Sequence, residues 1–318
     1  MQPNPSPPQP NPSNKLPQHI LESQQFTSET LFNLFQKADE LRINPSNSLN
    51  NKILASLFYE PSTRTRLSFE SAMLRLGGKV IGTENAKEFS SAVKGESLQD
   101  SIRVLEKYAD VIILRHPETC AAKQASEVSK IPIINAGDGK GQHPTQALLD
   151  VYTIYREFKK LDNLKIAMVG DLASGRTVRS LCYLLGKFKD IEIIFISPEN
   201  LKMKEDIKEY LTKHKITFKE ETDLNKILPE LDIIYMTRIQ KERISQEDYE
   251  KAKGKYVINE TNLSLIKPNA RILHPLPHVE EINLPIEIEE NDKRIAYFRQ
   301  AENGLYIRMA LLDMILNK

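Results

Sequence analysis

The regular alternation of short apolar runs with longer amphipathic stretches constrains the fold of this chain more than any other feature. Apolar, β-rich runs occur at 53–59, 111–114, 131–134, 165–169, 191–196, 233–236 and 271–273. Between them, apolar residues recur at helical spacing, as in Phe69, Met73 and Leu76. Such alternation is typical of parallel sheets joined by crossover helices. The sequence therefore predicts an α/β fold built from doubly wound parallel sheets.

The length of the chain and the position of one charged segment predict two domains. With 318 residues, of which 40% are hydrophobic, the chain is long enough for two cores of common size. The charged segment 159–163 separates two sets of strands and helices and is the natural hinge. We expect a small ligand to bind in the cleft between the two domains.

The charge balance excludes a protein-wide field that would attract nucleic acid or a membrane. The chain has 44 Lys and Arg against 43 Asp and Glu, so any anion binding must be local. No apolar stretch is long enough to cross a bilayer, and the N-terminus lacks the features of a secretory signal. Cys120 and Cys182 belong to no metal pattern, and we expect both to be reduced. These observations predict a cytoplasmic protein.

The first 17 residues hold seven of the chain's 18 prolines, mixed with Asn, Gln and Ser. Such a composition buries too little apolar surface to fold, so we expect residues 1–17 to be disordered or extended. A flexible terminal extension explains this tail better than a proline motif for a partner. We assign the tail no function.

The segment Ser62-Thr63-Arg64-Thr65-Arg66 follows a predicted strand and opens a predicted helix. The free backbone N–H groups and the helix dipole favour an anion at such a place. Ser62 or Thr63 can cap the helix, and Arg64 can add a charge-assisted contact to a phosphate. Taken alone, the segment fits an ordinary capped helix with solvated arginines equally well.

Four further polar segments also follow predicted strands, and they favour the phosphate-binding interpretation. They begin at Arg115, at His143, at Arg238 and at His274. In open parallel sheets the ligand crevice lies beyond the carboxyl ends of the strands. We therefore expect these segments to converge on one site.

Four of these motifs, in this order, resemble the catalytic chain of aspartate carbamoyltransferases. The motifs are Ser62-Thr63-Arg64-Thr65-Arg66, His143-Pro144-Thr145-Gln146, Arg238-x-Gln240-x-Glu242-Arg243 and His274-Pro275-Leu276-Pro277. The similarity extends from about Leu16 to Lys318. It implies transfer of the carbamoyl group of carbamoyl phosphate to L-aspartate, an early step of pyrimidine synthesis. It implies no cofactor and no metal.

The resemblance also implies how carbamoyl phosphate is bound. The binding residues would be Ser62, Thr63, Arg64, Thr65, Arg115, His143, Gln146, Leu276 and Pro277. Thr65, Arg115 and His143 would surround the carbonyl oxygen, and with Arg64 they would form the catalytic set. Gln146 and the carbonyl groups of Leu276 and Pro277 would accept hydrogens from the carbamoyl nitrogen.

The aspartate site implied by the resemblance consists of Arg176, Arg238, Gln240 and Lys94. Guanidinium groups suit a substrate with two carboxylates. Ser90 and Lys94 lie in a stretch, 88–97, that taken alone predicts a solvated polar loop. In the family these two residues reach into the active site of a neighbouring subunit, which implies a homotrimer with shared sites.

The resemblance divides the chain into a carbamoyl phosphate-binding domain, 18–158, completed by a C-terminal helix within 300–318, and an aspartate-binding domain, 159–299. This last helix, from roughly 305 to 316, would return to pack on the first domain. Regulatory chains, or other enzymes of the pyrimidine pathway, stay open as partners.

Several alternatives can be compared with this interpretation. An ornithine carbamoyltransferase would have Cys at the position of Pro275 and another sequence in place of 238–240. Residues 168–176 resemble a nucleotide-binding turn but lack the required glycine spacing. A metal role for His143 is not favoured either, because no second His, Cys or carboxylate lies around it at the sequence spacing of metal ligands. A carbamoyltransferase for another amino acid and a non-catalytic, anion-binding relative stay as alternatives. One departure from the family is His278, where arginine is common.

Overall fold

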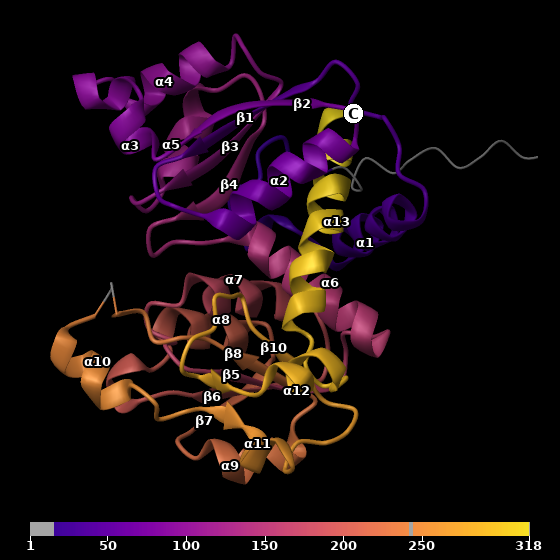
Figure 1. Ribbon diagram of the computed structural model, residues 1–318, viewed down its shortest axis with the longest axis vertical. Coiled ribbons are helices and arrows are strands. Elements are labelled where there is room, and N and C mark those ends of the chain that lie inside the picture. The colour runs from indigo at the N-terminus through magenta and orange to yellow at the C-terminus, as the bar shows by residue number, and fades with distance from the viewer. Residues whose placement is uncertain (1–15, 242–243, 318) are drawn as a thin grey trace, which may run out of the picture.

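The computed structural model describes residues 16–241 and 244–317 (Figure 1). All but two residues of the tail predicted to be disordered, together with Glu242, Arg243 and Lys318, lie outside the described residues. The described elements form two parallel sheets flanked by helices, which confirms the predicted fold class. Within the described part of the chain, no helix has both the length and the apolar character needed to span a membrane.

The first sheet has four parallel strands in the order β2-β1-β3-β4. These strands are β1 (Ile53–Phe58), β2 (Lys79–Glu84), β3 (Val111–His116) and β4 (Ile133–Asp138). Its helices are α1 (Ser28–Ile43), α2 (Thr63–Arg75), α3 (Ala86–Phe89), α4 (Leu98–Leu105), α5 (Ala121–Val128) and α6 (Pro144–Phe158), with short 3-10 turns η2 (Ser23–Gln25) and η3 (Ser91–Lys94). β4 extends to Asp138, four residues beyond the apolar run 131–134 that predicted it.

The second sheet has five parallel strands in the order β10-β8-β5-β6-β7. These strands are β5 (Leu164–Val169), β6 (Ile191–Ile196), β7 (Thr217–Glu221), β8 (Ile233–Met236) and β10 (Arg271–Leu273). Its helices are α7 (Arg176–Leu185), α8 (Glu205–Lys213), α9 (Leu224–Ile227), α10 (Gln246–Ala252), α11 (Glu260–Leu263) and α12 (Ile286–Asn291), with η4 (Glu199–Leu201) and η5 (Leu228–Glu230). A small ladder joins β9 (Ile258–Asn259) to β11 (Ile282–Asn283).

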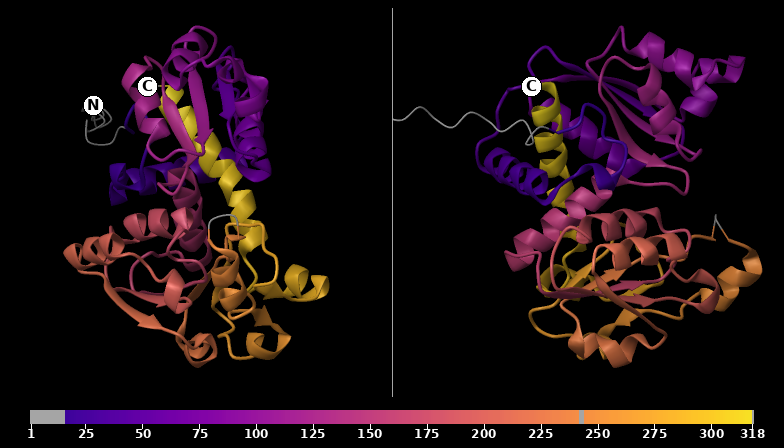
Figure 2. Two further views of the ribbon diagram at one scale, coloured as in Figure 1. Left: turned by 90° about the vertical axis from the view of Figure 1, so that its left-hand side faces the viewer. Right: turned by 180° about the vertical axis from the view of Figure 1, so that it is seen from behind.

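The last helix, α13 (Tyr297–Leu316), begins earlier than the sequence predicted and connects the two halves. It starts beside β10 of the second sheet and packs against α1, α2 and α6 of the first half. Figures 1 and 2 show it in yellow, running from the second half to the first. The earlier start is explained by Tyr297 and Gln300, which are buried where the helix leaves the second half.

The length and composition suggested two separate apolar cores, but the structure has a core that spans both sheets. The largest cluster contains residues from both sheets, for example Leu54 and Ile193, and it is continuous through α6 and α7. Two smaller clusters cover the remaining faces of the two sheets. Packing of α6 against α7 explains the continuity, because both helices place buried apolar side chains in one seam.

The stretch 88–97 is not the simple loop that its polar composition predicts. It contains the end of α3 and the 3-10 turn η3, and then Ser97 caps α4 by accepting from the N–H of Asp100. Asn85 supports α3 through a 2.7 Å hydrogen bond to Glu88. Local side-chain bonds of this kind hold short turns that carry no apolar periodicity.

Candidate active site

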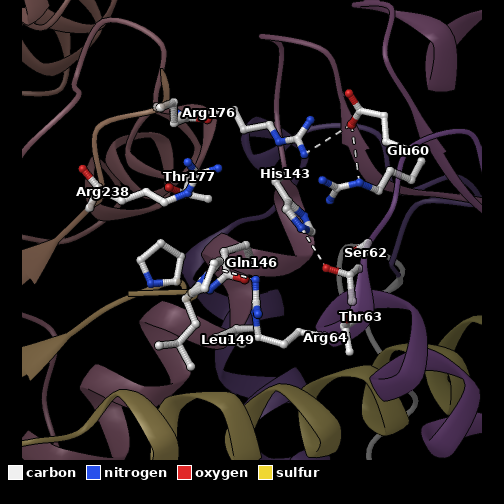
Figure 3. A pocket seen from close by; sticks show the side chains of 18 of the residues that line it. Glu60, Ser62, Thr63, Arg64, His143, Gln146, Leu149, Arg176, Thr177 and Arg238 are labelled. Carbon is white, nitrogen blue, oxygen red and sulfur yellow. Dashed lines mark hydrogen bonds and ion pairs between the residues drawn. The ribbon is translucent and has the colours of Figure 1, made fainter. Parts of the chain in front are cut away.

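Strand ends from both sheets open onto one pocket of about 960 Å³ (Figure 3). It brings together every residue that the sequence analysis placed in the site except Ser90 and Lys94. The predicted residues in its lining are Ser62, Thr63, Arg64, Thr65, Arg115, His143, Gln146, Arg176, Arg238, Gln240, Leu276 and Pro277. The convergence follows from the parallel topology, because the carboxyl ends of the strands meet at one edge.

The start of the helix at Ser62 lies at the pocket wall, at the end of the segment that connects β1 to α2. Ser62 occupies the N-cap position in an extended conformation, but its side chain makes no capping hydrogen bond. The expectation that Ser62 or Thr63 caps the helix is therefore wrong for Ser62, and Thr63 is already the first helical residue. The uncapped first turn directs backbone N–H groups outward, which is the arrangement that binds a phosphate.

Arg64 reaches across the pocket to the segment that follows β10. Its Nη2 donates a 2.8 Å hydrogen bond to the carbonyl oxygen of Leu276. The pKa of Arg64 is lowered, first by burial and then by the nearby charge of Arg238. Arg66, by contrast, forms ion pairs with Glu70 and Glu84 and does not line the pocket. Of the two arginines in the motif, Arg64 alone faces the site.

His143 is almost fully buried just before α6, which begins with Pro144. Its Nε2 lies 3.3 Å from Oγ1 of Thr65, and its Nδ1 lies 3.5 Å from Oγ1 of Thr145. Burial lowers the pKa of His143 well below its ordinary value, and the charges of three arginines lower it further. The imidazole is therefore neutral at pH 7 and can donate one hydrogen without carrying a charge.

Arg115 and Arg176 approach a carboxylate that the sequence analysis did not single out. Oε2 of Glu60 lies 3.5 Å from Nε of Arg115 and 3.8 Å from Nη2 of Arg176. Arg176 also donates a 2.9 Å hydrogen bond to the carbonyl of Gly139. A Cβ at Gly137 would lie 2.9 Å from the Arg176 guanidinium, so glycine is required there for the arginine to fit. Glu60 thus joins strand ends from both halves.

Other lining residues also escaped the motif analysis, namely Lys140, Thr177, Thr237, Gln300 and Arg308. A sequence signal existed for Arg308, a single charge within the apolar stretch of the last helix. A signal for Glu60 existed in its position directly before Pro61, at the end of a strand.

The pocket is strongly cationic. Its described lining includes Arg64, Arg115, Lys140, Arg176, Arg238 and Arg308, against the single carboxylate of Glu60. Burial and, after it, the charge of Arg238 lower the pKa of Arg64, and an anion that enters the pocket would offset the repulsion between the two guanidinium groups. Among residues 16–241 and 244–317, no group of three or more His, Cys, Asp or Glu side chains could hold a metal ion.

Ser90 and Lys94 lie outside this pocket. Ser90 Oγ donates a 2.5 Å hydrogen bond to the carbonyl of Ala86, and Lys94 is exposed at the end of η3. Figure 1 shows α3 and α4 at an outer edge of the first half. Nε2 of His278, the departure from the family pattern, lies 3.3 Å from Oε1 of Glu289.

Comparisons with known proteins match both halves of the chain. The family model "Aspartate/ornithine carbamoyltransferase, carbamoyl-P binding domain" matches residues 18–156. The model "Aspartate/ornithine carbamoyltransferase, Asp/Orn binding domain" matches residues 162–315. Together they define the class of the protein as the carbamoyltransferases.

Comparison with individual relatives narrows this class to the aspartate carbamoyltransferases. Aspartate carbamoyltransferase 1, chloroplastic, of Pisum sativum is 55% identical over 304 residues, covering 93% of this chain and 78% of the relative. The aspartate carbamoyltransferase catalytic subunit of Vibrio campbellii is 46% identical, covering 94% and 97%. The catalytic subunit of M. jannaschii aspartate transcarbamoylase has a TM-score of 0.86 at 46% identity, covering 94% and 98%.

A fourth relative was solved with both substrates of the reaction. The aspartate transcarbamoylase of Trypanosoma cruzi in complex with carbamoyl phosphate and aspartate has a TM-score of 0.87 at 36% identity, covering 95% of this chain and 96% of that one. The chain belongs to the aspartate carbamoyltransferase family and corresponds to its catalytic chain. The resemblance seen in the four motifs is thereby confirmed.

Proposed function

We propose that this chain transfers the carbamoyl group of carbamoyl phosphate to the amino group of L-aspartate, giving N-carbamoyl-L-aspartate and phosphate (EC 2.1.3.2). This is an early step of pyrimidine synthesis. The observation that carries the proposal is the convergence of Arg64, Arg115, His143, Arg176 and Arg238 in one cationic pocket. The reaction joins two anions, and such a pocket binds both.

The phosphate of carbamoyl phosphate fits the start of α2. The backbone N–H groups of the first turn, the hydroxyls of Ser62, Thr63 and Thr65, and the Arg64 guanidinium face the same space. As the carbonyl carbon bonds to the incoming nitrogen, its bond to the phosphate oxygen breaks and the phosphate leaves as an anion. Arg64 and the helix dipole stabilise the charge that develops on this leaving group.

The carbonyl oxygen of the carbamoyl group gains negative charge when the amine attacks. Thr65, Arg115 and His143 surround the position assigned to it, and the 3.3 Å contact between Thr65 and His143 supports this grouping. Because His143 is neutral, it stabilises the developing negative charge by donating a hydrogen bond and adds no positive charge of its own. Fixed donors of this kind are the main source of rate acceleration in acyl transfer.

The carboxylates of aspartate are assigned to Arg176, Arg238 and Gln240. Arg176 is buried and oriented by Gly139, whereas Arg238 and Gln240 are half-buried beyond β8. The ammonium group of aspartate must first lose a proton to solvent, because only the unprotonated amine can attack; a second proton leaves the nitrogen once the C–N bond has formed, and the departing phosphate can accept it. Holding the amine beside the carbonyl carbon supplies the remainder of the acceleration.

Ser90 and Lys94 are assigned to the pocket of a neighbouring subunit. Their position outside the pocket of their own chain supports this role, because they can act only on another copy. We therefore propose a homotrimer in which each site is completed by Ser90 and Lys94 of an adjacent chain, with Lys94 contributing to the aspartate site. The names of bacterial relatives contain the term catalytic subunit, which agrees with an oligomer and leaves regulatory chains open as partners.

The domain division and the location stay predictions. We propose a carbamoyl phosphate-binding domain at 18–158 with the helix in 300–318, and an aspartate-binding domain at 159–299. Packing of α13 on α1, α2 and α6 supports this division. A cytoplasmic location is the expectation from the sequence, whereas several plant relatives are chloroplastic.

A colorimetric assay for carbamoyl-amino acids tests the function. With carbamoyl phosphate, we expect product from L-aspartate and none above background from L-ornithine, because the pocket contains Pro275 and Arg238. Product from ornithine but not aspartate would favour the ornithine-type alternative. Absence of product from either amine would favour a non-catalytic, anion-binding relative.

A further inference from the structure

A fully buried carboxylate lies directly behind the pocket. Asp150 is on α6, one helical turn after Gln146, and it is 0% exposed. It accepts hydrogen bonds from Nε2 of Gln146 at 2.9 Å, from Nε2 of Gln300 at 2.6 Å and from the hydroxyl of Tyr235 at 2.8 Å. The three donors come from α6, α13 and β8, so Asp150 is anchored from three elements.

The position of Asp150 determines which end of the Gln146 amide faces the pocket. Oδ1 of Asp150 accepts from two amide nitrogens and can only be satisfied by donors. Gln146 must therefore turn its NH2 group inward, which leaves its carbonyl oxygen as the polar group available to a ligand. Gln300 cannot exchange its own ends either, because its oxygen accepts from the N–H of His274 at 2.8 Å.

We propose that Asp150 is a positioning residue that fixes Gln146 as a hydrogen-bond acceptor and so makes the pocket select an acyl group carrying NH2 over one carrying CH3. The inference rests on the proposed function, since it concerns the carbamoyl nitrogen of carbamoyl phosphate. Asp150 itself touches no reacting atom. An acceptor aimed at the carbamoyl nitrogen gains a hydrogen bond from NH2 and nothing from a methyl group.

The selection does not depend on the charge of Asp150. Burial raises the pKa of Asp150 to about 7, against the attraction of Arg308. Oδ1 accepts from two amide nitrogens, so a proton on Asp150 belongs on Oδ2, where the Tyr235 hydroxyl would rotate from donor to acceptor, and Gln146 keeps its orientation in either state. The surrounding Tyr235, Arg308 and His143 do not titrate near pH 7, because the pKa is raised above 10 for Tyr235, is about 10 for Arg308 and is well below 6.5 for His143.

Acetyl phosphate is the probe, because it replaces the NH2 of carbamoyl phosphate by CH3. Calorimetric titration of each ligand into the full-length protein gives a ratio of dissociation constants. The inference predicts that the unsubstituted chain prefers carbamoyl phosphate and that Asp150→Leu, of similar size but without an acceptor, reduces this preference about tenfold. Asp150→Asn keeps an acceptor oxygen, so its preference stays within about threefold of the unsubstituted chain.

Three controls separate positioning from a loss of packing. Asp313→Leu makes the same substitution at a buried Asp on α13 that binds Lys37 and does not line the pocket, and it should leave the ratio unchanged. Gln146→Ala should reduce the preference about tenfold, and adding Asp150→Leu should reduce it no further. The preference of the unsubstituted chain should also be constant between pH 6 and 8.5. If Asp150→Leu does not fold, Asp150→Ala removes the same acceptor with less bulk.

The outcomes distinguish this inference from the function on which it rests. Equal losses of affinity for both phosphates in Asp150→Leu would overturn the positioning role, and so would a tenfold loss of preference in Asp150→Asn. Those results leave the transfer to aspartate intact. Absence of carbamoyl phosphate binding by the unsubstituted chain would overturn the proposed function and the inference with it.

Discussion

The two ends of the pocket are built differently. At the carbamoyl phosphate end, Thr65 and His143 are buried and belong to the first turns of α2 and α6 or stand directly before them. At the aspartate end, Arg176 is buried at the start of α7, but Arg238 and Gln240 are half-buried and belong to no helix or strand. Helix starts fixed by a packed core hold side chains in place before a ligand arrives, whereas a connecting segment takes its final geometry from what it contacts.

This difference suggests that the two ends of the pocket have separate roles in the reaction. The first end supplies the fixed donors that chemistry requires, and the second end supplies recognition of the amino acid. Glu60 connects them, because its carboxylate lies near Arg115 of the first half and Arg176 of the second. Substitutions at the first end should therefore affect turnover most, and substitutions at the second should affect the affinity for aspartate most.

The largest effect is expected for Arg64→Ala. Turnover should fall about a thousandfold, because a cation at the leaving phosphate is lost. The free energy of unfolding should change by about 1 kcal/mol or less, since the Arg64 side chain lies at the open pocket wall and its hydrogen bond to Leu276 is exposed. Steady-state kinetics and a urea titration measure the two quantities. A variant with near-normal turnover would remove Arg64 from the catalytic set.

A smaller and different effect is expected for Arg238→Ala. The KM for aspartate should rise about thirtyfold, because a charge-assisted contact to a carboxylate is lost. The kcat should fall by much less, because the donors around the carbonyl oxygen are unchanged. Initial rates at saturating carbamoyl phosphate, over a range of aspartate concentrations, separate the two constants. A loss confined to kcat would contradict these separate roles.

Mixed trimers test whether the pocket is shared between chains. Arg64→Ala and Lys94→Ala subunits should each be inactive alone. After unfolding and reassembly in equal amounts, about one quarter of the sites should combine an intact Arg64 with an intact Lys94 from the neighbour. Activity should then recover to about a quarter of that of the unsubstituted protein. Reassembled trimers without recovered activity would show that each chain completes its own site.

The smallest expected effect concerns stability and pH. Because the folded chain lowers the pKa of His143, the unfolded chain binds a proton more readily, and stability falls as pH drops through about 6.5. Between pH 8 and 6 the unsubstituted chain should lose about 0.8 kcal/mol more than His143→Gln. Urea titrations at both pH values give this difference. Equal losses in the two proteins would mean that folding does not lower the pKa of His143.

The sequence was sufficient to predict the buried strands, including β4 and β10 at two of the sheet edges, but not the exposed edge strands β2 and β7. β1, β3, β5, β6 and β8 carry continuous apolar runs because helices cover both of their faces. The edge strands β2 and β7 are mostly exposed and read as polar segments. Their pairing depends on the neighbouring strand, which local sequence does not contain.

The same limit applies to the site. The motifs predicted the residues that face the pocket, because strand ends carry local signals. Glu60, Asp150 and Arg308 were missed because their partners lie far away in sequence. Asp150, for example, meets Tyr235 and Gln300 only after both sheets and α13 have packed.

Binding of carbamoyl phosphate to three proteins tests the separate roles of the two ends most directly. Calorimetric titration should give dissociation constants within about threefold for the unsubstituted chain and Arg238→Ala, and no detectable binding to Arg64→Ala. Aspartate should then be carbamoylated rapidly by the unsubstituted chain alone at low aspartate concentration. Binding retained by Arg64→Ala, or lost equally in Arg238→Ala, would contradict the assignment of carbamoyl phosphate to the helix start at Ser62.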